Sequence, residues 1–209
     1  MIDLEVFNEL RFDIYKYYPI GEPRLKTSQE DAIKKIIVEK MDSKSEVNIQ
    51  WKKVIDDYRK LGFNLVENMY FIEFPNLMAS LDLNHEVEGI TIKKKLIVCM
   101  SLLTPYYTIY FTYTHRVKLE EGQGSAILGP LVFLNDKSYS SLKPVVNLES
   151  IMSSIEVNFP GYKFVDHYAL MINKLQGGLP YGFDRDLPPE KYTYYQFLFD
   201  PNQPQNISY

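Results

Sequence analysis

The chain has 209 residues, of which 45% are hydrophobic and 24% are charged, and its formal net charge is −4. These values exclude a collagen, a mainly disordered chain and a coiled-coil rod, and they are typical of an ordinary folded domain. A chain of this length buries roughly 70% of its unfolded surface, so it needs neither a metal nor a disulfide to fold.

Cysteine usage and the start of the chain favour a cytoplasmic protein. Cys99 is the single cysteine, so no intramolecular disulfide can form, whereas small secreted domains tend to use several. Residues 1–5 contain acids where a signal peptide needs a basic and then an apolar region. The best apolar run, Leu96–Leu103, is far shorter than the roughly 18 residues of a membrane span. We therefore expect a soluble protein with no membrane association.

The excess negative charge lies in the last third of the chain. Residues 119–209 contain 6 Lys and Arg against 10 Asp and Glu, whereas the charges of the earlier residues balance. The only basic run, Lys93-Lys94-Lys95, does not make one patch in a strand, because its middle residue takes the opposite face. Nucleic acid is therefore not an expected partner, since phosphate binding needs a basic face. An acidic C-terminal surface either attracts a basic protein or serves solubility alone.

The first sixty residues predict three amphipathic helices. Apolar residues recur at three- and four-residue steps in three stretches: residues 4–14, 32–41 and 47–61. Thr27 or Ser28 can cap the second helix, and Ser45 can cap the third. Gly62 follows the third helix where a C′ glycine belongs, and Trp51 lies on that helix's apolar stripe.

After Gly62 the hydrophobic period changes to two residues, which predicts β-strands. Four strands are expected: Leu65–Phe74, Leu77–Leu83, Ile90–Leu103 and Tyr106–Lys118. The short connection at Thr104-Pro105 favours an antiparallel hairpin between the last two. A glycine-rich loop at 120–130 and a short strand at Leu131–Leu134 should follow.

The last third of the chain mixes helix and strand. Residues 162–176 favour a strand at their start and leave the state of their end open. The other expected elements are a helix capped by Asn147, a Gly/Pro-rich loop and a final strand, at 147–155, 177–189 and Tyr192–Phe199. This order predicts an α+β fold, with N-terminal helices packed on a mainly antiparallel, Tyr-rich sheet. Residues 1–209 then form a single domain, in which residues 1–62 are a possible helical lobe.

No motif assigns a catalytic, cofactor-binding or metal-binding residue. The glycines from Gly122 to Gly129 miss the G-x-G-x-x-G spacing, because Ile127 stands where the third glycine should be. His85-Glu86 lacks the second histidine of H-E-x-x-H, since Gly89 takes that position. Cys99 lies in an apolar run, which raises a thiol pKa and lowers its reactivity. These observations disfavour an enzymatic activity but do not exclude one.

The acidic C-terminal loop is the first candidate for a functional surface. Asp184-Arg185-Asp186 lies in a Gly/Pro-rich segment among aromatic and acidic residues, and it also fits a solvated loop with a local ion pair. This profile resembles that of small bacterial binding proteins, for instance immunity proteins that block a toxin. The resemblance implies occlusion of a basic partner such as a toxin by an acidic, Tyr-rich surface. The expected contact residues are Tyr181, Asp184, Asp186, Glu190, Tyr192 and Tyr194.

The alternative hypothesis is a small-molecule-binding or enzymatic domain. An α+β fold of this kind often places a pocket between its sheet and its helices. The candidate lining residues are Tyr110, Tyr113 and His115. A deep pocket with converging polar groups would favour this hypothesis, whereas a flat acidic face would favour the protein partner.

Overall fold

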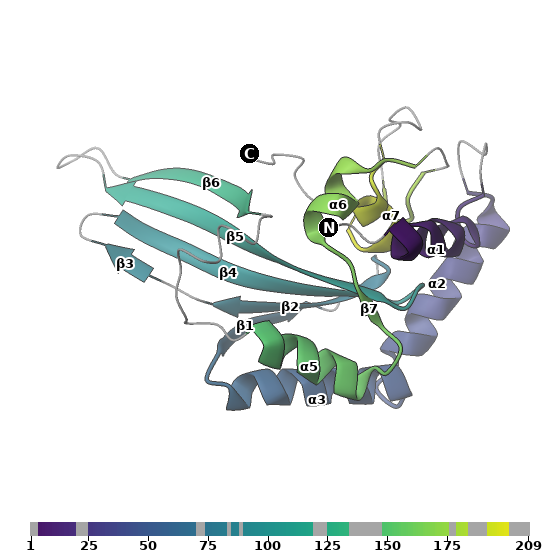
Figure 1. Ribbon diagram of the computed structural model, residues 1–209, viewed down its shortest axis with the longest axis horizontal. Helices are drawn as coiled ribbons and strands as arrows, with labels where there is room; N and C mark the ends of the chain where they lie inside the picture. The colour runs from purple at the N-terminus through teal and green to yellow at the C-terminus, as the bar shows by residue number, and fades with distance from the viewer. Residues whose placement is uncertain are drawn as a thin grey trace.

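The computed structural model confirms the α+β prediction (Figure 1). It describes residues 4–19, 25–69, 74–82, 85–87, 90–118, 125–133, 148–175, 179–183 and 192–200. The helices are α1 (Leu4–Tyr15), α2 (Thr27–Met41), α3 (Glu46–Lys60), α5 (Leu148–Asn158), α6 (His167–Ile172) and α7 (Tyr194–Leu198). The strands are β1 (Asn64–Met69), β2 (Asn76–Asp82), β3 (His85–Val87), β4 (Ile90–Ser101), β5 (Tyr106–Lys118), β6 (Ser125–Phe133) and β7 (Lys163–Phe164).

The strands form one mainly antiparallel sheet in the order β1-β2-β4-β5-β6. β3 pairs with the first residues of β4, and β7 runs parallel to the first residues of β5. Across the three central strands, Met78 pairs with Cys99, which pairs with Thr108. The next such row is Ser80, Ile97 and Tyr110, and paired residues share a face of the sheet.

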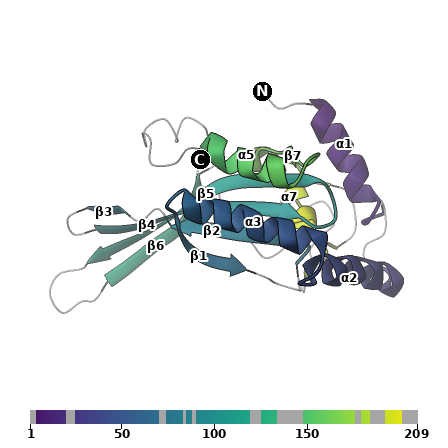
Figure 2. The same cartoon turned by 90° about the horizontal axis from the view of Figure 1, so that it is seen from below.

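Helices cover both faces of one half of this sheet (Figures 1 and 2). We call the face under α1, α6 and α7 the upper face, as Figure 1 shows it, because Tyr110 on that face meets Tyr195 of α7. The lower face packs on α3 and α5, where Tyr107 donates to Glu156 of α5 at 3.4 Å. In the other half, β3, β6 and the adjoining ends of β4 and β5 project beyond the helices.

The covered half has continuous apolar strands rather than alternating ones. Residues 76–81 of β2 are all buried, so the expectation of a half-buried strand at Leu77–Leu83 is wrong for this stretch. The physical reason is that helices lie over both faces of the sheet here, so successive residues of β2 are shielded from solvent whichever face they take. The N-terminal helices contribute Trp51 and Tyr58 to the same hydrophobic cluster as the strands.

Local sequence signals set the ends of α3, as expected. The Ser45 hydroxyl accepts a hydrogen bond from the Asn48 N–H at 3.1 Å, which caps the first turn. Gly62 follows the helix with φ +86°, a conformation that favours glycine. The cap expected for α2 at Thr27 or Ser28 is wrong. That helix begins after Lys26, whose N–H donates to the Gln29 side chain at 2.7 Å.

The final strand expected at Tyr192–Phe199 is wrong, because most of this segment is the short helix α7. Thr193 and Gln196 form a reciprocal capping box, with Gln196 accepting from the Thr193 N–H at 2.8 Å. Residues 192–199 are all buried, so their apolar and aromatic composition did not distinguish a buried helix from a buried strand. The segment 162–176 begins with β7, as expected, and then continues as α6.

Two other boundaries differ from expectation. β6 begins at Ser125, so the loop expected at 120–130 is wrong from that residue onward. Gly129 and Pro130 lie at a bulge, where two residues of β6 oppose Thr114 of β5. The strand expected at Leu65–Phe74 corresponds to β1, and residues 70–73 lie outside the described residues, as does the predicted cap Asn147.

Candidate functional site

α3 and α5 lie side by side on the lower face of the sheet (Figure 2), and a groove forms between them. Its volume is about 540 Å³. From α3 it is lined by Asp57, Lys60 and the C-cap residue Leu61. From α5 it is lined by Glu149, Ser150, Ser153, Ser154 and Val157.

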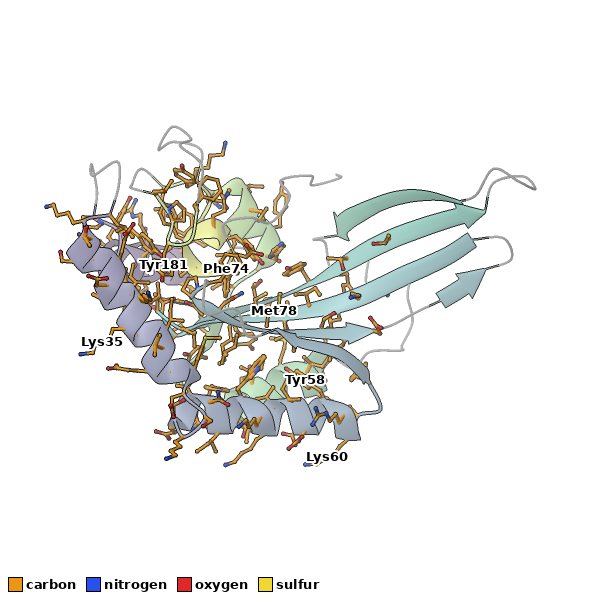
Figure 3. The ribbon with its side chains drawn as sticks, turned by 180° about the vertical axis from the view of Figure 1, so that it is seen from behind. Lys35, Tyr58, Lys60, Phe74, Met78 and Tyr181 are labelled. Atoms are coloured by element: carbon orange, nitrogen blue, oxygen red, sulfur yellow. The ribbon has the colours of Figure 1, made fainter. Side chains whose placement is uncertain are left out.

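The helical periods of α3 and α5 explain why these residues line the groove. In α3, Tyr58 is buried and points to the sheet, whereas Lys60 points outward (Figure 3). In α5, Ile151 and Ile155 are the buried residues, which leaves Ser150, Ser153, Ser154 and Val157 on the outer side. The spacing of those four is i, i+3, i+4 and i+7, a single face of a helix.

A hydrogen-bonded carboxylate lies in the wall of the groove. Lys60 Nζ donates to Asp57 Oδ1 at 2.9 Å, and Ser154 Oγ donates to Asp57 Oδ2 at 3.0 Å. The hydrogen bond from Lys60 holds the pKa of Asp57 below its usual value, and the Ser154 hydrogen bond adds to this effect. Asp57 is therefore ionised and fixed between the two helices at neutral pH. Each carboxylate oxygen can still accept a further hydrogen bond from a ligand.

The rim of the groove is apolar. Val157 is 75% exposed and Leu61 is 46% exposed, although both are large hydrophobic residues. The small serine side chains between them leave room for another chain to approach the helices closely. The groove thus combines apolar anchors, small residues and the carboxylates of Asp57 and Glu149.

A second polar cluster lies inside the protein, between the upper face of the sheet and α6 and α7. Tyr110 Oη lies 3.1 Å from Tyr195 Oη, and Cys99 Sγ lies 3.8 Å from the same Tyr195 oxygen. The His167 ring stacks on Tyr110 with centroids 3.9 Å apart. Burial lowers the pKa of His167 to about 3 and raises that of Cys99 to about 12. At neutral pH the cluster is therefore uncharged, and it joins α6 and α7 to the sheet.

The structure does not place the predicted contact tyrosines on a surface. Tyr192 is 1% exposed and Tyr194 is 6% exposed, which corrects the expectation that they present their rings to a partner. Their rings contribute to the core, where Tyr194 packs on Phe7 of α1 and Tyr192 packs on Phe183. Tyr181 is half-buried and packs against the same core. The three acidic members of the predicted surface, Asp184, Asp186 and Glu190, lie outside the described residues.

Of the alternative pocket residues, the structure describes the side chain of Tyr110. Tyr110 is buried on the upper face, against Tyr195 and His167. Tyr113 and His115 belong to β5, but their side chains lie outside the described residues. Tyr110 therefore lies between the sheet and the helices, as the alternative hypothesis expects, and a pocket shared with the other two residues stays a prediction.

Sequence reasoning missed the α3–α5 groove, although a signal for it was present. The spacing of Ser150, Ser153, Ser154 and Val157 marks a helix face that is small and partly apolar rather than charged. Only the packing of α5 beside α3 brings Asp57 and Lys60 to that face. Within the described residues, no group of three His, Cys, Asp or Glu is placed to hold a metal ion. In that same part of the chain, no helix has the length and apolarity needed to cross a membrane.

Together these features define an α+β protein with a half-covered sheet and a helix-lined groove. Comparison with protein-family models, curated proteins and solved structures finds no match for the chain.

Proposed function

We propose that the chain is a non-enzymatic protein-binding module that holds a basic, amphipathic helix of a partner protein in the α3–α5 groove. The observation that carries the proposal is the coincidence of two exposed apolar side chains, Leu61 and Val157, with an ionised carboxylate in one groove. A single exposed hydrophobic residue is common on protein surfaces, but two of them beside one groove are typical of a contact surface.

The shape of the groove favours a helix as the bound element. An amphipathic helix inserts apolar side chains at i, i+3 or i+4 and i+7 between two supporting helices. Ser150, Ser153 and Ser154 have small side chains, which allow such a helix to pack closely against α5. The volume of about 540 Å³ accommodates a few anchoring side chains and leaves the body of the partner outside.

The charge of the groove favours a basic partner. Asp57 and Glu149 are its two acids, and its single cation, Lys60, already donates to Asp57. The net charge of −4 adds a long-range attraction for a basic protein. Where the bound segment borders a basic active site, this mode of binding occludes that site, which is how an immunity-type inhibitor of a toxin would act.

The test compares the groove with an exposed apolar residue elsewhere. A photo-reactive amino acid at position 157 should give one cross-linked partner in cells that encode the chain, whereas the same group at Val38 of α2 should not. Val38 is 50% exposed and lies outside the groove, so it is a matched control. The absence of an adduct at position 157 would contradict the proposal.

Affinity measurements then test the contacts. Leu61→Asp with Val157→Asp should weaken binding of the purified partner at least tenfold in calorimetry, because apolar anchors carry a large share of binding energy. Val38→Asp should leave the affinity unchanged. Higher salt should also weaken binding, since the partner is basic. A partner that binds the groove variant as tightly as the native chain would show that it docks elsewhere.

A further inference from the structure

The carboxylate of Asp57 in the α3–α5 groove is held by two hydrogen bonds of unequal character. Ser154 of α5 donates to its Oδ2 at 3.0 Å, from a half-buried side chain on the neighbouring helix. Lys60 donates to its Oδ1 at 2.9 Å from the same helix, and the Lys60 side chain is 75% exposed. Asn158 of α5 adds a smaller stabilisation of the ionised form. The contacts from α5 therefore fix the carboxylate, whereas the long, exposed Lys60 side chain can rotate into solvent at little cost.

Lys60 competes with a basic partner for this carboxylate. The side chains that line the groove include two acids, Asp57 and Glu149, and Lys60 is the cation among them. While the Lys60 ammonium stays on Asp57 Oδ1, an incoming cation meets a like charge beside the acid that attracts it. When Lys60 turns away, the same oxygen can accept a hydrogen bond from the partner instead.

We propose that Asp57 selects an arginine of the partner helix, and that Lys60 holds the place of this arginine in the free protein and leaves it on binding. The inference rests on the function proposed above, because it names the side chain of the basic helix that the groove recognises. Asp57 is then the contact residue, Ser154 positions its carboxylate, and Lys60 lowers the affinity by competition.

The chemistry of this exchange favours arginine over lysine. A partner lysine replaces one ammonium by another on the same oxygen, so the exchange gains no hydrogen bond. A guanidinium has its N–H donors in a planar fork, and it can donate to both carboxylate oxygens while Ser154 keeps its own hydrogen bond to Oδ2. Asp57 is 37% exposed, so an incoming cation loses part of its hydration, and this loss costs more for the strongly hydrated ammonium.

The first measurement tests the competing contact without any ligand. The hydrogen bond from Lys60 is the main cause that lowers the pKa of Asp57, so Lys60→Met should raise this pKa toward its ordinary value. Lys34→Met of α2 removes the same charge at an exposed position outside the groove, and it should leave the pKa of Asp57 unchanged. Carbon-detected NMR of the Asp57 carboxyl group measures both values. An unchanged pKa in Lys60→Met would overturn the inference.

The second measurement uses two synthetic amphipathic peptides as probes. Both have leucines along one face of a helix, and they differ only in having arginine or lysine at the flanking positions. Each peptide is titrated into the full chain labelled with ¹⁵N, and amide shifts in α3 and α5 report binding. The arginine peptide should bind the native chain about threefold more tightly than the lysine peptide. Lys60→Met should strengthen binding of the arginine peptide by about threefold more, whereas Lys34→Met should leave it nearly unchanged.

Two isosteric variants separate Asp57 from the general charge of the groove. Asp57→Asn keeps the size of the side chain and removes its charge, so the preference for arginine over lysine should disappear. Glu149→Gln removes the same charge from the other acid of the groove. It should weaken binding of both peptides by a similar factor and leave the ratio of their affinities unchanged. A ratio that is lost in Glu149→Gln, or kept in Asp57→Asn, would overturn the inference.

The outcomes also separate this inference from the proposed function. If neither peptide shifts the amides of α3 and α5, the groove does not bind a basic helix and both are wrong. If both peptides bind equally well and Lys60→Met has no effect, the proposed function stands and the selection of arginine is wrong. Ser154→Ala keeps Asp57 charged but removes its positioning hydrogen bond, so it should also reduce the preference for arginine. It replaces Asp57→Asn where that variant does not fold.

Discussion

The strands β4 and β5 run through both the covered and the projecting half of the sheet, and their composition and burial differ between the two halves. In β4, residues 96–100 are all buried under helices on both faces, and their sequence is continuously apolar and uncharged. The preceding residues 90–95 are not continuously apolar and include three consecutive lysines. In β5, residues 106–111 are buried, whereas Thr112 and Thr114 are half-buried. The strands are therefore buried on both faces where helices cover them, and they become partly accessible where the helical cover ends.

The two halves also differ in how polar groups are treated. In the covered half, the lowered pKa of His167 and the raised pKa of Cys99 keep these two buried side chains neutral. Several buried polar side chains there, including Thr108 and Ser80, have no hydrogen-bond partner among the described residues. Toward the projecting half, the polar side chains of Lys95 and Thr114 are only half-buried. Three substitutions test whether the two halves of the sheet differ in this way.

The largest effect should come from the helical cover itself. Trp51 is fully buried in α3, so Trp51→Ala should lower the free energy of unfolding by about 3–5 kcal/mol. Ile49→Ala on the same helix should change it by less than about 0.5 kcal/mol, because Ile49 is exposed. Chemical denaturation measures both values. A near-neutral Trp51→Ala would show that α3 does not pack on the sheet as described.

The next effect is a dependence of stability on pH that arises at His167. Its pKa is about 3 in the folded chain and 6.5 when solvated, so below pH 6.5 the unfolded chain takes up a proton that the folded chain does not. Stability should therefore be complete above pH 6.5 and fall as the pH drops, by about 2 kcal/mol at pH 5 from this group alone.

The His167→Phe variant separates this contribution from that of the carboxylates. It keeps an aromatic ring against Tyr110 and removes the titrating group. The loss of stability between pH 7 and pH 5 should be smaller in the variant by about 2 kcal/mol, measured by denaturant unfolding at each pH. Identical pH profiles would mean that His167 is solvated and that α6 does not seal this part of the sheet.

The smallest effect compares two threonines on the same face of β5. Thr108 is fully buried and its hydroxyl has no hydrogen-bond partner in the described part of the chain, so Thr108→Val should raise the free energy of unfolding by about 1 kcal/mol. Thr114 lies beyond the helical cover, and Thr114→Val should change it by less than about 0.5 kcal/mol. Equal effects at the two positions would show that the boundary of the covered half is wrongly placed.

Much of the fold could be predicted from local patterns. The stripe of α3, its Ser45 cap and the C′ position of Gly62 all depend on residues close in sequence, and each is confirmed. The β4–β5 hairpin is confirmed because alternation and a short turn are also local signals. The capping box at Thr193 and Gln196 was equally local, but the apolar, aromatic composition of the segment favoured a strand instead.

The candidate sites were less predictable because they depend on distant elements. Asp57 and Ser154 are 97 residues apart and meet only through the packing of α3 on α5. The prediction that Tyr192 and Tyr194 form a surface relied on composition, which does not distinguish an exposed tyrosine from a buried one.

Local sequence signals predicted the N-terminal helices and the central strands, because periodicity, caps and turns act over a few residues. They did not predict the helix α7 or the start of β6. Tertiary structure alone decided which faces are covered, since burial depends on what lies across the sheet rather than along the chain. The tertiary structure made Tyr192 and Cys99 core residues and formed the groove beside Asp57. Both outcomes depend on packing between residues that are distant in sequence, which periodicity along the chain does not report.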